Sequence, residues 1–399
     1  MKNICLHFQV HQPYRLRPFS FLHIGEDNHY FDETANRDAL ARAARNAYLP
    51  ANRILLDLIR QYGEQFRVSF SVSGLALDQF QEYMPEVAAS FRALADTGCV
   101  EFLALPYGHS LAGLKSRREV TRQLTAHADA IAHLFGQRPT AFCNTDLAPG
   151  NVIAEAAAGL GFRTMLTTAL PGLNAGRAHS NPGLPEMRML LQHGSLSGDI
   201  ANRFSDEEWR EWPLTAGKFR EWLQAMPQED EVVNLSLDYT TFGERHPAAS
   251  GIFDFLKALP AEMLTIPGWR FATVSEAAAA AEPLPAAVIP AEGLLQEWLG
   301  NDLQQDAFES LYALEKKVHA CDDPQLQRDW LYLQASDHFY YMSTRHLGDG
   351  ALHRQLSPYN HPFQAFMNYM NVLADFTLRI AQCPDRQKTK VHERYTIEA

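Results

Sequence analysis

The sequence predicts an α/β fold: a closed or nearly closed barrel of parallel strands, followed by a helical C-terminal region. Seven short β-rich runs alternate with helix-like segments over the first two thirds of the chain, and this alternation is typical of parallel strands joined by crossover helices. Polar residues gather where these runs end, as they do at the rim of a barrel. After a stretch rich in alanine and proline, only helical patterns follow.

The β-rich runs and the helices between them follow one another in order. We expect strands at Ile4–Val10, Arg67–Val72, Val100–Leu105, Thr140–Asn144, Thr164–Thr168, Arg188–Leu191 and Val232–Leu237, with a further short one at Arg270–Val274. We expect helices at Ala35–Tyr62, Met84–Thr97, Arg117–Phe135, Gly150–Leu160 and Thr215–Ala225. Seven runs fit a barrel better than a flat, doubly wound sheet. The chain also has no Gly-rich dinucleotide fingerprint after its first run and no phosphate-binding Gly-Lys-Ser/Thr loop.

The character of the chain changes after the last strand pattern. Ala277–Ala281 reads as the end of a helix, and Pro283, Pro285 and Pro290 mark a linker. Three long helices are then expected, at Leu294–His319, Pro324–Leu347 and Pro362–Gln382. We therefore predict a barrel domain over residues 1–282, a helical bundle over residues 283–384 and a polar tail over residues 385–399.

Composition excludes several classes of protein. The formal net charge is -12, which argues against general binding to nucleic acid or to anionic membranes, because both need basic patches. The five cysteines are widely spaced and form no CxxC pair, so neither a zinc site nor a disulfide framework is indicated. The N-terminus enters a strand without a signal-peptide pattern, and no run of about 18 apolar residues occurs. These observations predict a reduced, cytoplasmic protein.

The stretch Val232–His246 is the most informative one. Val233, Leu235 and Leu237 alternate with polar residues, so the strand should bury one face in an apolar layer. Asp238 stands where the apolar run ends, and a loop with two aromatic residues, a glycine and charged residues follows. A carboxylate at the C-terminal end of a barrel strand is where such folds keep catalytic groups. The alternative is an aspartate that only begins a turn or caps a helix.

Other strand ends carry polar and aromatic groups as well. They are His11, Gln12, Tyr14, Glu101, Tyr107, His109, Asn144, Asp146 and Tyr239. His7 and His11 suggest a metal at first sight, but side chains four residues apart along a strand are separated by roughly 13 Å, so one ion cannot bridge them. Cys143 is a weak candidate nucleophile, because its run is apolar and no histidine is near it in sequence. We expect neither a metal nor another cofactor.

Asp146 and Asp238 lie at two strand ends of one predicted rim. Such a pair suits cleavage of a glycosidic bond, because one carboxyl group protonates the leaving oxygen while the other, ionised, meets the developing oxocarbenium ion. A separation of roughly 5–5.5 Å would indicate retention of configuration through a covalent intermediate. Burial under the helical bundle would raise the pKa of the carboxyl group that acts as the acid. Nearby aromatic rings would suit sugar faces.

Five segments, in order along the chain, resemble glycoside hydrolase family 57, whose α-amylase-like members act on α-1,4-glucans. They are His11-Gln-Pro-Tyr14, Gly98-Cys-Val-Glu-Phe-Leu-Ala-Leu-Pro-Tyr-Gly-His109, Asn144-Thr-Asp-Leu147, Asp238-Tyr-Thr-Thr-Phe-Gly-Glu244 and Trp298-Leu-Gly-Asn-Asp-Leu-Gln-Gln-Asp306. The run Ser336-Asp-His-Phe-Tyr-Tyr-Met-Ser343 also looks like the short α-amylase-type members. The resemblance implies an incomplete (β/α)7 barrel whose active-site cleft is completed by a C-terminal helical bundle.

The resemblance also implies roles for particular residues. Asp238 matches the family's general acid/base, and Asp146 falls at the position of its nucleophile, in retaining chemistry that requires no metal. His11, Glu101, His109, Trp298, Asn301 and Asp302 fall where the family binds sugar, and we expect Gln12, Tyr107 and Tyr239 to bind the substrate as well. Two positions depart from the pattern: the family's nucleophile is usually a glutamate, and Thr240 stands where a glutamate is common. One methylene less withdraws the Asp146 carboxylate by about 1.5 Å, and a misplacement of ~1 Å can cost on the order of a hundredfold in rate.

Several functions therefore stay open. The main hypothesis is an α-amylase-type glycoside hydrolase acting on α-1,4-glucans. The aspartate at position 146 motivates a second one, a catalytically silent glucan-binding or regulatory protein. A third is transglycosylation, as in a 4-α-glucanotransferase or a branching enzyme. A fourth is a metal-dependent polysaccharide deacetylase on a related barrel, which the histidine spacing disfavours.

Overall fold

The computed structural model describes residues 1–181, 183–286, 295–345 and 357–384. The chain divides into two compact units. The barrel unit comprises Met1–Gln12, Arg37–Tyr107 and Ala112–Ala291, and the helical unit comprises Pro13–Asn36, Gly108–Leu111 and Glu292–Ala399. The sequence analysis placed the boundary between the two parts at residue 282. It did not assign the earlier segments Pro13–Asn36 and Gly108–Leu111 to the helical part.

The strands of the barrel unit include every run that the sequence predicts. Their bounds are β1 Lys2–Val10, β2 Val68–Val72, β3 Val100–Phe102, β4 Ala141–Cys143, β5 Thr164–Thr167, β6 His179–Asn181, β7 Leu184–Leu191, β8 Val232–Asp238, β9 Trp269–Phe271 and β10 Leu284–Pro285. The predicted runs correspond to β1 to β5, β7, β8 and the short β9. The sequence analysis missed β6 and β10, whose few residues carry no clear alternation.

The strands form two sheets that together make an incomplete barrel. One sheet has the order β3-β2-β1-β8, with β9 beside the start of β1, and the other has the order β10-β6-β7-β5-β4. Within the described residues, isolated parallel bridges join the sheets, Ala104 to Phe142 on one side and Gln192 to Asn234 on the other. Strands β1, β2, β3, β4, β5, β7 and β8 are therefore parallel neighbours around a ring. The ring is incomplete because single bridges replace ladders at these two joints.

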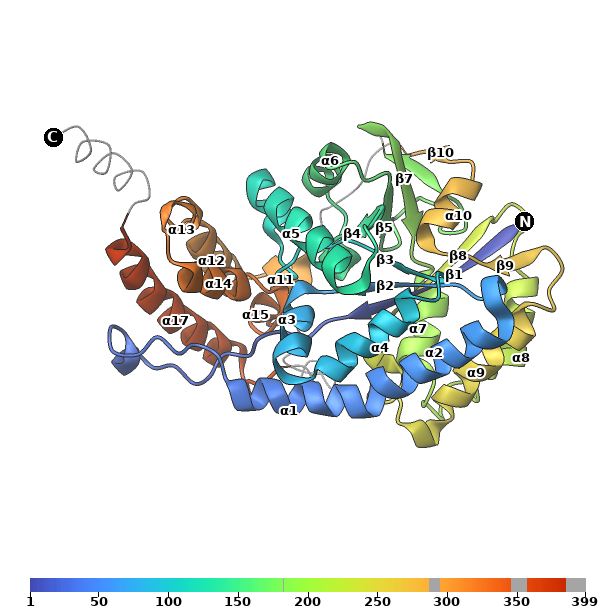
Figure 1. The fold of residues 1–399 in the computed structure, drawn as a ribbon, viewed down its shortest axis with the longest axis horizontal. Helices are drawn as coiled ribbons and strands as arrows, with labels where there is room; N and C mark the ends of the chain where they lie inside the picture. The colour runs from blue at the N-terminus through green and yellow to red at the C-terminus, as the bar shows by residue number, and fades with distance from the viewer. Residues whose placement is uncertain (182, 287–294, 346–356, 385–399) are drawn as a thin grey trace. The chain divides into compact units, whose positions relative to one another are not determined.

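Helices connect the strands and cover their outer face (Figure 1). Their bounds are α1 Glu33–Ala43, α2 Leu49–Tyr62, α3 Gly74–Tyr83, α4 Pro85–Ala95, α5 Arg117–Phe135, α6 Asn151–Gly159, α7 Gly194–Arg203, α8 Ala216–Gln224, α9 Ile252–Met263 and α10 Val274–Ala280. All predicted helices of this part are present. The sequence analysis missed α3, α7 and α9. Two glycines in α7 and Pro260 in α9 explain the last two, because both residue types lower the helical signal.

The alternation predicted for β8 is confirmed by the packing. Val233, Leu235 and Leu237 lie in the large apolar cluster between the strands and the outer helices. A second, smaller cluster contains Cys5 and Cys143 together with residues of β5 and β7, and it lies on the inner side of the ring. Because side chains alternate along a strand, Asn234, Ser236 and Asp238 face this inner side.

The helical unit contains shorter helices than the sequence predicts. They are α11 Gln296–Leu299, α12 Asp302–Tyr312, α13 Glu315–Ala320, α14 Pro324–Leu333, α15 Ser336–Tyr340 and α17 Pro362–Gln382. The prediction of a long helix is confirmed for α17. The other two predicted helices are broken, because Asn301 forms a reciprocal cap with Gln304 at the start of α12 and Ala335 is extended before α15. Leu294, 346–347, Pro290 and the predicted tail lie outside the described residues.

The expectation of no disulfide is wrong. Cys321, at the end of α13, is bonded to Cys383, at the end of α17, with their Cα atoms 5.7 Å apart. The two residues are 62 positions apart, so only the packing of the helices brings them together. Cys5, Cys99 and Cys143 are buried free thiols.

Among the described residues, no helix combines the length and the apolar character that crossing a membrane requires.

Candidate active site

Asp146 and Asp238 stand at the carboxyl ends of two strands of the barrel unit. Asp238 is the last residue of β8, and Asp146 follows β4 by three residues. Since the strands of the ring are parallel, their carboxyl ends meet at one rim, where barrels of this kind carry their functional groups. Asp238 is level with Gln9 of β1, and Gln9 is level with Ser71 of β2.

The carboxyl group of Asp238 is exposed and oriented by the loop that follows it. Its Oδ1 atom accepts a hydrogen bond from the amide of Thr240 at 2.8 Å and another from the Thr240 hydroxyl at 2.7 Å. These bonds hold one carboxylate oxygen close to the backbone. The burial that we expected for this acid is not observed.

Asp146 has an unusual backbone conformation. Its φ and ψ angles are 51° and 28°, and Leu147 also has a positive φ of 56°. Left-handed conformations cost non-glycine residues of order 1–3 kcal/mol and cluster at functional sites, and aspartate is among the residues that tolerate them best. The side chain of Asp146 is half-buried. The short turn thus presents an aspartate directly after β4.

Cys143, three residues before Asp146, does not qualify as a nucleophile. Burial raises the pKa of the Cys143 thiol to about 12; a hydrogen bond with Ser71 lowers it and the negative charge of Asp146 raises it. The thiol therefore stays protonated at neutral pH, and the thiolate is the nucleophilic form.

The inner face below Asp238 is polar. His7 lies between Ser236, 2.7 Å from its Nδ1 atom, and Ser71, 3.1 Å from its Nε2 atom. Gln9 donates to the Ser236 hydroxyl at 3.2 Å. Burial lowers the pKa of His7 to about 3, so the ring is neutral. Hydroxyl groups occupy both of its nitrogens, which gives His7 a structural role beneath the rim.

His11 lies where β1 leaves the barrel. Its Nδ1 atom is 2.7 Å from the hydroxyl of Ser73, and Ser73 also caps α3 by accepting from the amide of Ala76. This contact fixes the orientation of the His11 ring near the carboxyl ends of β1 and β2. His11 thus lies directly after the last residue of β1.

Gln12 and Tyr239 turn away from the inner face. Gln12 is 6% exposed and donates to the hydroxyl of Tyr48 at 3.0 Å. Tyr239 is 0% exposed and donates to Oδ1 of Asn52 at 2.7 Å. Side chains this buried in the outer core cannot reach a sugar in this conformation. We therefore withdraw the assignment of these two residues to substrate binding.

Glu101 also has a structural position. Its carboxylate accepts from the amide of Ser275 at 3.0 Å, from the Ser275 hydroxyl and from the Ser69 hydroxyl at 3.3 Å. Burial raises the pKa of Glu101, and these hydrogen bonds lower it in part. Glu101 is level with Ser69 and hence with His7, two residues or roughly 7 Å below the level of Asp238. It binds the start of α10 and does not line the rim, contrary to its assignment by resemblance.

Tyr107 keeps a position compatible with the rim. Its hydroxyl donates to Asp78 at 2.6 Å, and its ring lies against Gly74, where a Cβ atom would come within 2.1 Å of the ring. Gly74 therefore permits the ring to cover the start of α3. Tyr107 is partly exposed.

The remaining predicted residues belong to the helical unit. His109 is buried, with a φ of 49°, and its Nδ1 atom is 3.2 Å from the Ser336 hydroxyl. Asn301 caps α12, and its amide also donates to the carbonyl of Met342 at 3.0 Å. Trp298 is half-buried on α11, and Asp302 is exposed in the first turn of α12. Asn301 is thus committed to the fold of this unit.

Sequence reasoning missed the residues that hold the predicted ones in place. Ser73 orients His11, and Asn52 binds Tyr239. Asn52 did leave a signal, because it stands among the apolar residues of the buried face of α2. A polar residue in such a row indicates a buried hydrogen-bond partner. Ser73 left no such signal in the sequence, since serine is common at any helix start.

The barrel unit is thus a ring of parallel strands with Asp146 and Asp238 at the carboxyl ends of β4 and β8. The model of glycosyl hydrolase family 57 matches residues 5–291. A protein named putative alpha-amylase, from Methanocaldococcus jannaschii, is 32% identical over 95% of this chain and 85% of its own length. The chain belongs to glycosyl hydrolase family 57, a family of glycoside-bond-cleaving enzymes.

Solved structures agree on the fold. A family 57 branching enzyme from Thermococcus kodakaraensis, in complex with glucose, superposes with a TM-score of 0.66 at 14% identity, covering 87% of this chain and 86% of its own. The 4-alpha-glucanotransferase from Thermococcus litoralis superposes with a TM-score of 0.62 at 15% identity over 85% of this chain. This chain spans 56% of the length of that glucanotransferase.

Proposed function

We propose that this protein cleaves α-1,4-glucosidic bonds in glucans, with retention of configuration, by means of Asp238 and Asp146. The observation that carries the proposal is the position of the two aspartates at the carboxyl ends of β8 and β4 in one parallel ring of a family 57 chain. The printed name of the Methanocaldococcus jannaschii relative, a putative alpha-amylase, supports this substrate class.

In the first step, protonated Asp238 gives its proton to the glycosidic oxygen while the Asp146 carboxylate attacks the anomeric carbon. The bond from that carbon to the oxygen breaks, and a covalent glycosyl–aspartate forms. In the second step Asp238, now ionised, removes a proton from water, and the resulting hydroxide displaces Asp146. With a sugar hydroxyl in place of water, the same step joins two glucans.

The roles are tested by removing one carboxyl group at a time. Wild-type protein should shorten maltoheptaose, and Asp238→Asn should lower kcat by at least about a thousandfold. Asp146→Ala and Asp238→Ala are then assayed with an aryl α-maltoside and azide. Azide attacks the anomeric carbon directly in the Asp146 variant, giving the β-azide. In the Asp238 variant it intercepts the glycosyl–enzyme, giving the α-azide. The opposite configurations would reverse the assignment, and an inactive wild type would overturn the function.

Products distinguish hydrolysis from transfer. Only chains shorter than the supplied maltoheptaose indicate hydrolysis, and longer chains indicate transglycosylation. The names of the two structural neighbours, a branching enzyme and a glucanotransferase, motivate this measurement.

The aspartate at position 146 favours one second candidate, a silent glucan-binding protein. In that case maltoheptaose binds, as calorimetry would detect, but no product forms. Asp146→Glu, which extends the carboxylate by about 1.5 Å, would then create turnover. Turnover by the wild type rejects this candidate.

We propose a cytoplasmic location, as the composition suggests, and one observation opposes it. Disulfides such as Cys321–Cys383 are rare in reducing compartments. The oxidation state of these two cysteines in cells decides between a reducing, cytoplasmic location and an oxidising one.

A further inference from the structure

We propose that Tyr239 and Asn52 are positioning residues for Asp238, fixing where its carboxylate stands at the rim; this rests on the proposed function. Tyr239 follows Asp238 directly. Asp238 has an extended backbone, with φ and ψ of -60° and 130°, and consecutive side chains of an extended segment point to opposite faces. Asp238 therefore faces inward while Tyr239 reaches outward into the helix layer. Because the two share one backbone, holding Tyr239 also holds Asp238.

A chain of hydrogen bonds anchors the Tyr239 hydroxyl. It donates to Oδ1 of Asn52 on α2 at 2.7 Å, and the Asn52 amide donates to the hydroxyl of Ser90 on α4 at 2.8 Å. The Ser90 hydroxyl donates in turn to the carbonyl of Val87 at 2.7 Å. Each donor in this chain has an acceptor, so the bonds lock one another's direction. The end of β8 is thus tied to two outer helices.

The ring of Tyr239 is equally constrained. It stacks on Tyr48 with the ring planes 8° apart and the centroids 6.0 Å apart, and it contacts Phe8 and Phe70, each at 5.1 Å. Tyr48 accepts a hydrogen bond from Gln12, which directly follows His11. The same pair of tyrosines therefore connects the end of β8, which carries Asp238, with the end of β1, which His11 follows.

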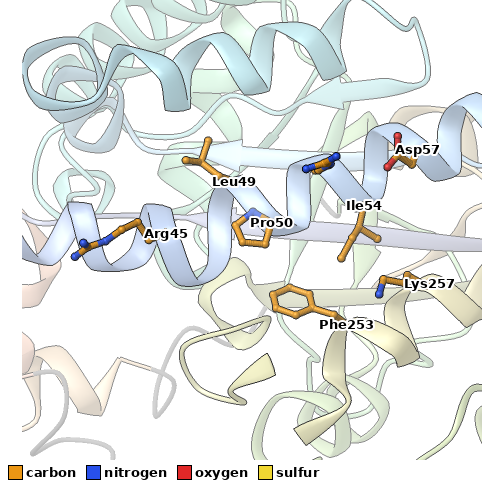
Figure 2. A pocket seen from close by; sticks show the side chains of 8 residues that line it. Arg45, Leu49, Pro50, Ile54, Asp57, Phe253 and Lys257 are labelled. Carbon is orange, nitrogen blue, oxygen red and sulfur yellow. The ribbon is translucent and has the colours of Figure 1, made fainter. Parts of the chain in front are cut away.

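The helical segment that carries Tyr48 and Asn52 has an irregular turn where it meets the loop after Asp238. Pro50 has no amide hydrogen, so the α-helical bond to the carbonyl of Asn46 cannot form, and the helix widens into a π-turn over Ala44–Tyr48. The loop after Asp238 lies against this turn: a Cβ atom on Gly243, whose φ is +113°, would come within 1.9 Å of the Asn46 oxygen. Only glycine fits there. Next to this contact the helix borders a surface pocket, in which Pro50 and Ile54 point toward Phe253 of α9 (Figure 2).

The test compares two substrates that differ in their need for a proton. Maltoheptaose needs the proton of Asp238 on its leaving oxygen, whereas α-maltosyl fluoride releases fluoride with little acid assistance. We expect Tyr239→Phe to lower kcat/KM for maltoheptaose at least about tenfold. For α-maltosyl fluoride, kcat/KM reports only the formation of the glycosyl–enzyme, before Asp238 acts as the base, and it should change by less than about threefold. Asn52→Ser should have the same effect, and it replaces Tyr239→Phe in this test if the Tyr239 variant does not fold.

The matched control is Tyr369→Phe, which removes another buried hydroxyl, one that donates to the carbonyl of Leu333 at 2.9 Å. It should leave the ratio of the two rates at the wild-type value. Equal losses on both substrates, or no loss, would overturn the proposal. Amide hydrogen exchange of residues 239–246 gives a reading that needs no activity: it should be faster in Tyr239→Phe than in the wild type and in Tyr369→Phe. Unchanged exchange refutes the positioning role, whereas a wild type without turnover refutes only the proposed function.

Discussion

The Thr240 hydroxyl lies 2.7 Å from Oδ1 of Asp238, and the Thr240 amide donates to the same oxygen at 2.8 Å. The family resemblance implies a glutamate at position 240, which would bring a second negative charge. Threonine instead supplies a neutral donor that fixes one oxygen of the acid. In the proposed mechanism the other oxygen, Oδ2, transfers the proton.

This contact predicts the effect of Thr240→Val. Losing one hydrogen bond to a carboxylate costs roughly 1.5 kcal/mol, so kcat/KM on maltoheptaose should fall about tenfold. Folding stability should change little, because Asp238 is exposed. Thr240→Ser keeps the hydroxyl and should stay within about twofold of the wild type. If both variants retain full activity, the hydroxyl does not orient the acid.

Glu101 should matter for stability and not for sugar binding. Glu101→Gln places an amide opposite the donors of Ser275 and Ser69, and a buried donor left unsatisfied costs about 1–3 kcal/mol. We expect urea unfolding to show this loss while KM for maltoheptaose stays within about twofold. Glu86→Gln, on an exposed acid in the first turn of α4, is the control and should change neither. A large rise in KM with unchanged stability would restore Glu101 to the binding site.

His7 should make folding sensitive to acid. Burial lowers its pKa to about 3 in the folded protein, whereas in the unfolded chain it is near 6.5. Above pH 6.5 neither state binds the proton, and stability is at its full value. As the pH falls from 6.5 toward 3, the unfolded state gains the proton first, so stability declines; at pH 4.5 the loss is about 2–3 kcal/mol.

The measurement is urea unfolding at pH 7.5 and pH 4.5. His7→Asn should reduce the difference between the two free energies of unfolding by this amount. His29→Asn, at an exposed histidine, should leave the difference as in the wild type. An unchanged difference in His7→Asn would mean that His7 is protonated in the folded protein.

The disulfide should stabilise the helical unit. Cys321 and Cys383 close a loop across a separation of 62 residues, and a loop of this length is worth about 4 kcal/mol in the chain-entropy account. Cys383→Ser should therefore lower the thermal midpoint of this unit. A reductant should lower the midpoint of the wild type in the same way and leave that of the variant unchanged. A wild type insensitive to reductant, with five thiols titrating in denaturant, would exclude the disulfide.

The sequence by itself determined the ring of strands. Runs such as Val232–Leu237 show their alternation directly, because burying one face of a strand in an apolar core imposes a period of two on the residues themselves. It also determined that Asp146 and Asp238 stand at the ends of such runs. These are local properties, written in neighbouring residues.

Tertiary structure alone decided which of the candidate residues face the rim. Gln12, Glu101 and Tyr239 belong to the same motifs as His11 and Asp238, yet their side chains are bound by Tyr48, Ser275 and Asn52. The disulfide and the breaks in the C-terminal helices were decided in the same way. The physical reason is that a side chain's partner lies on another element, tens or hundreds of residues away, so its direction is set by packing and is absent from the pattern of its neighbours.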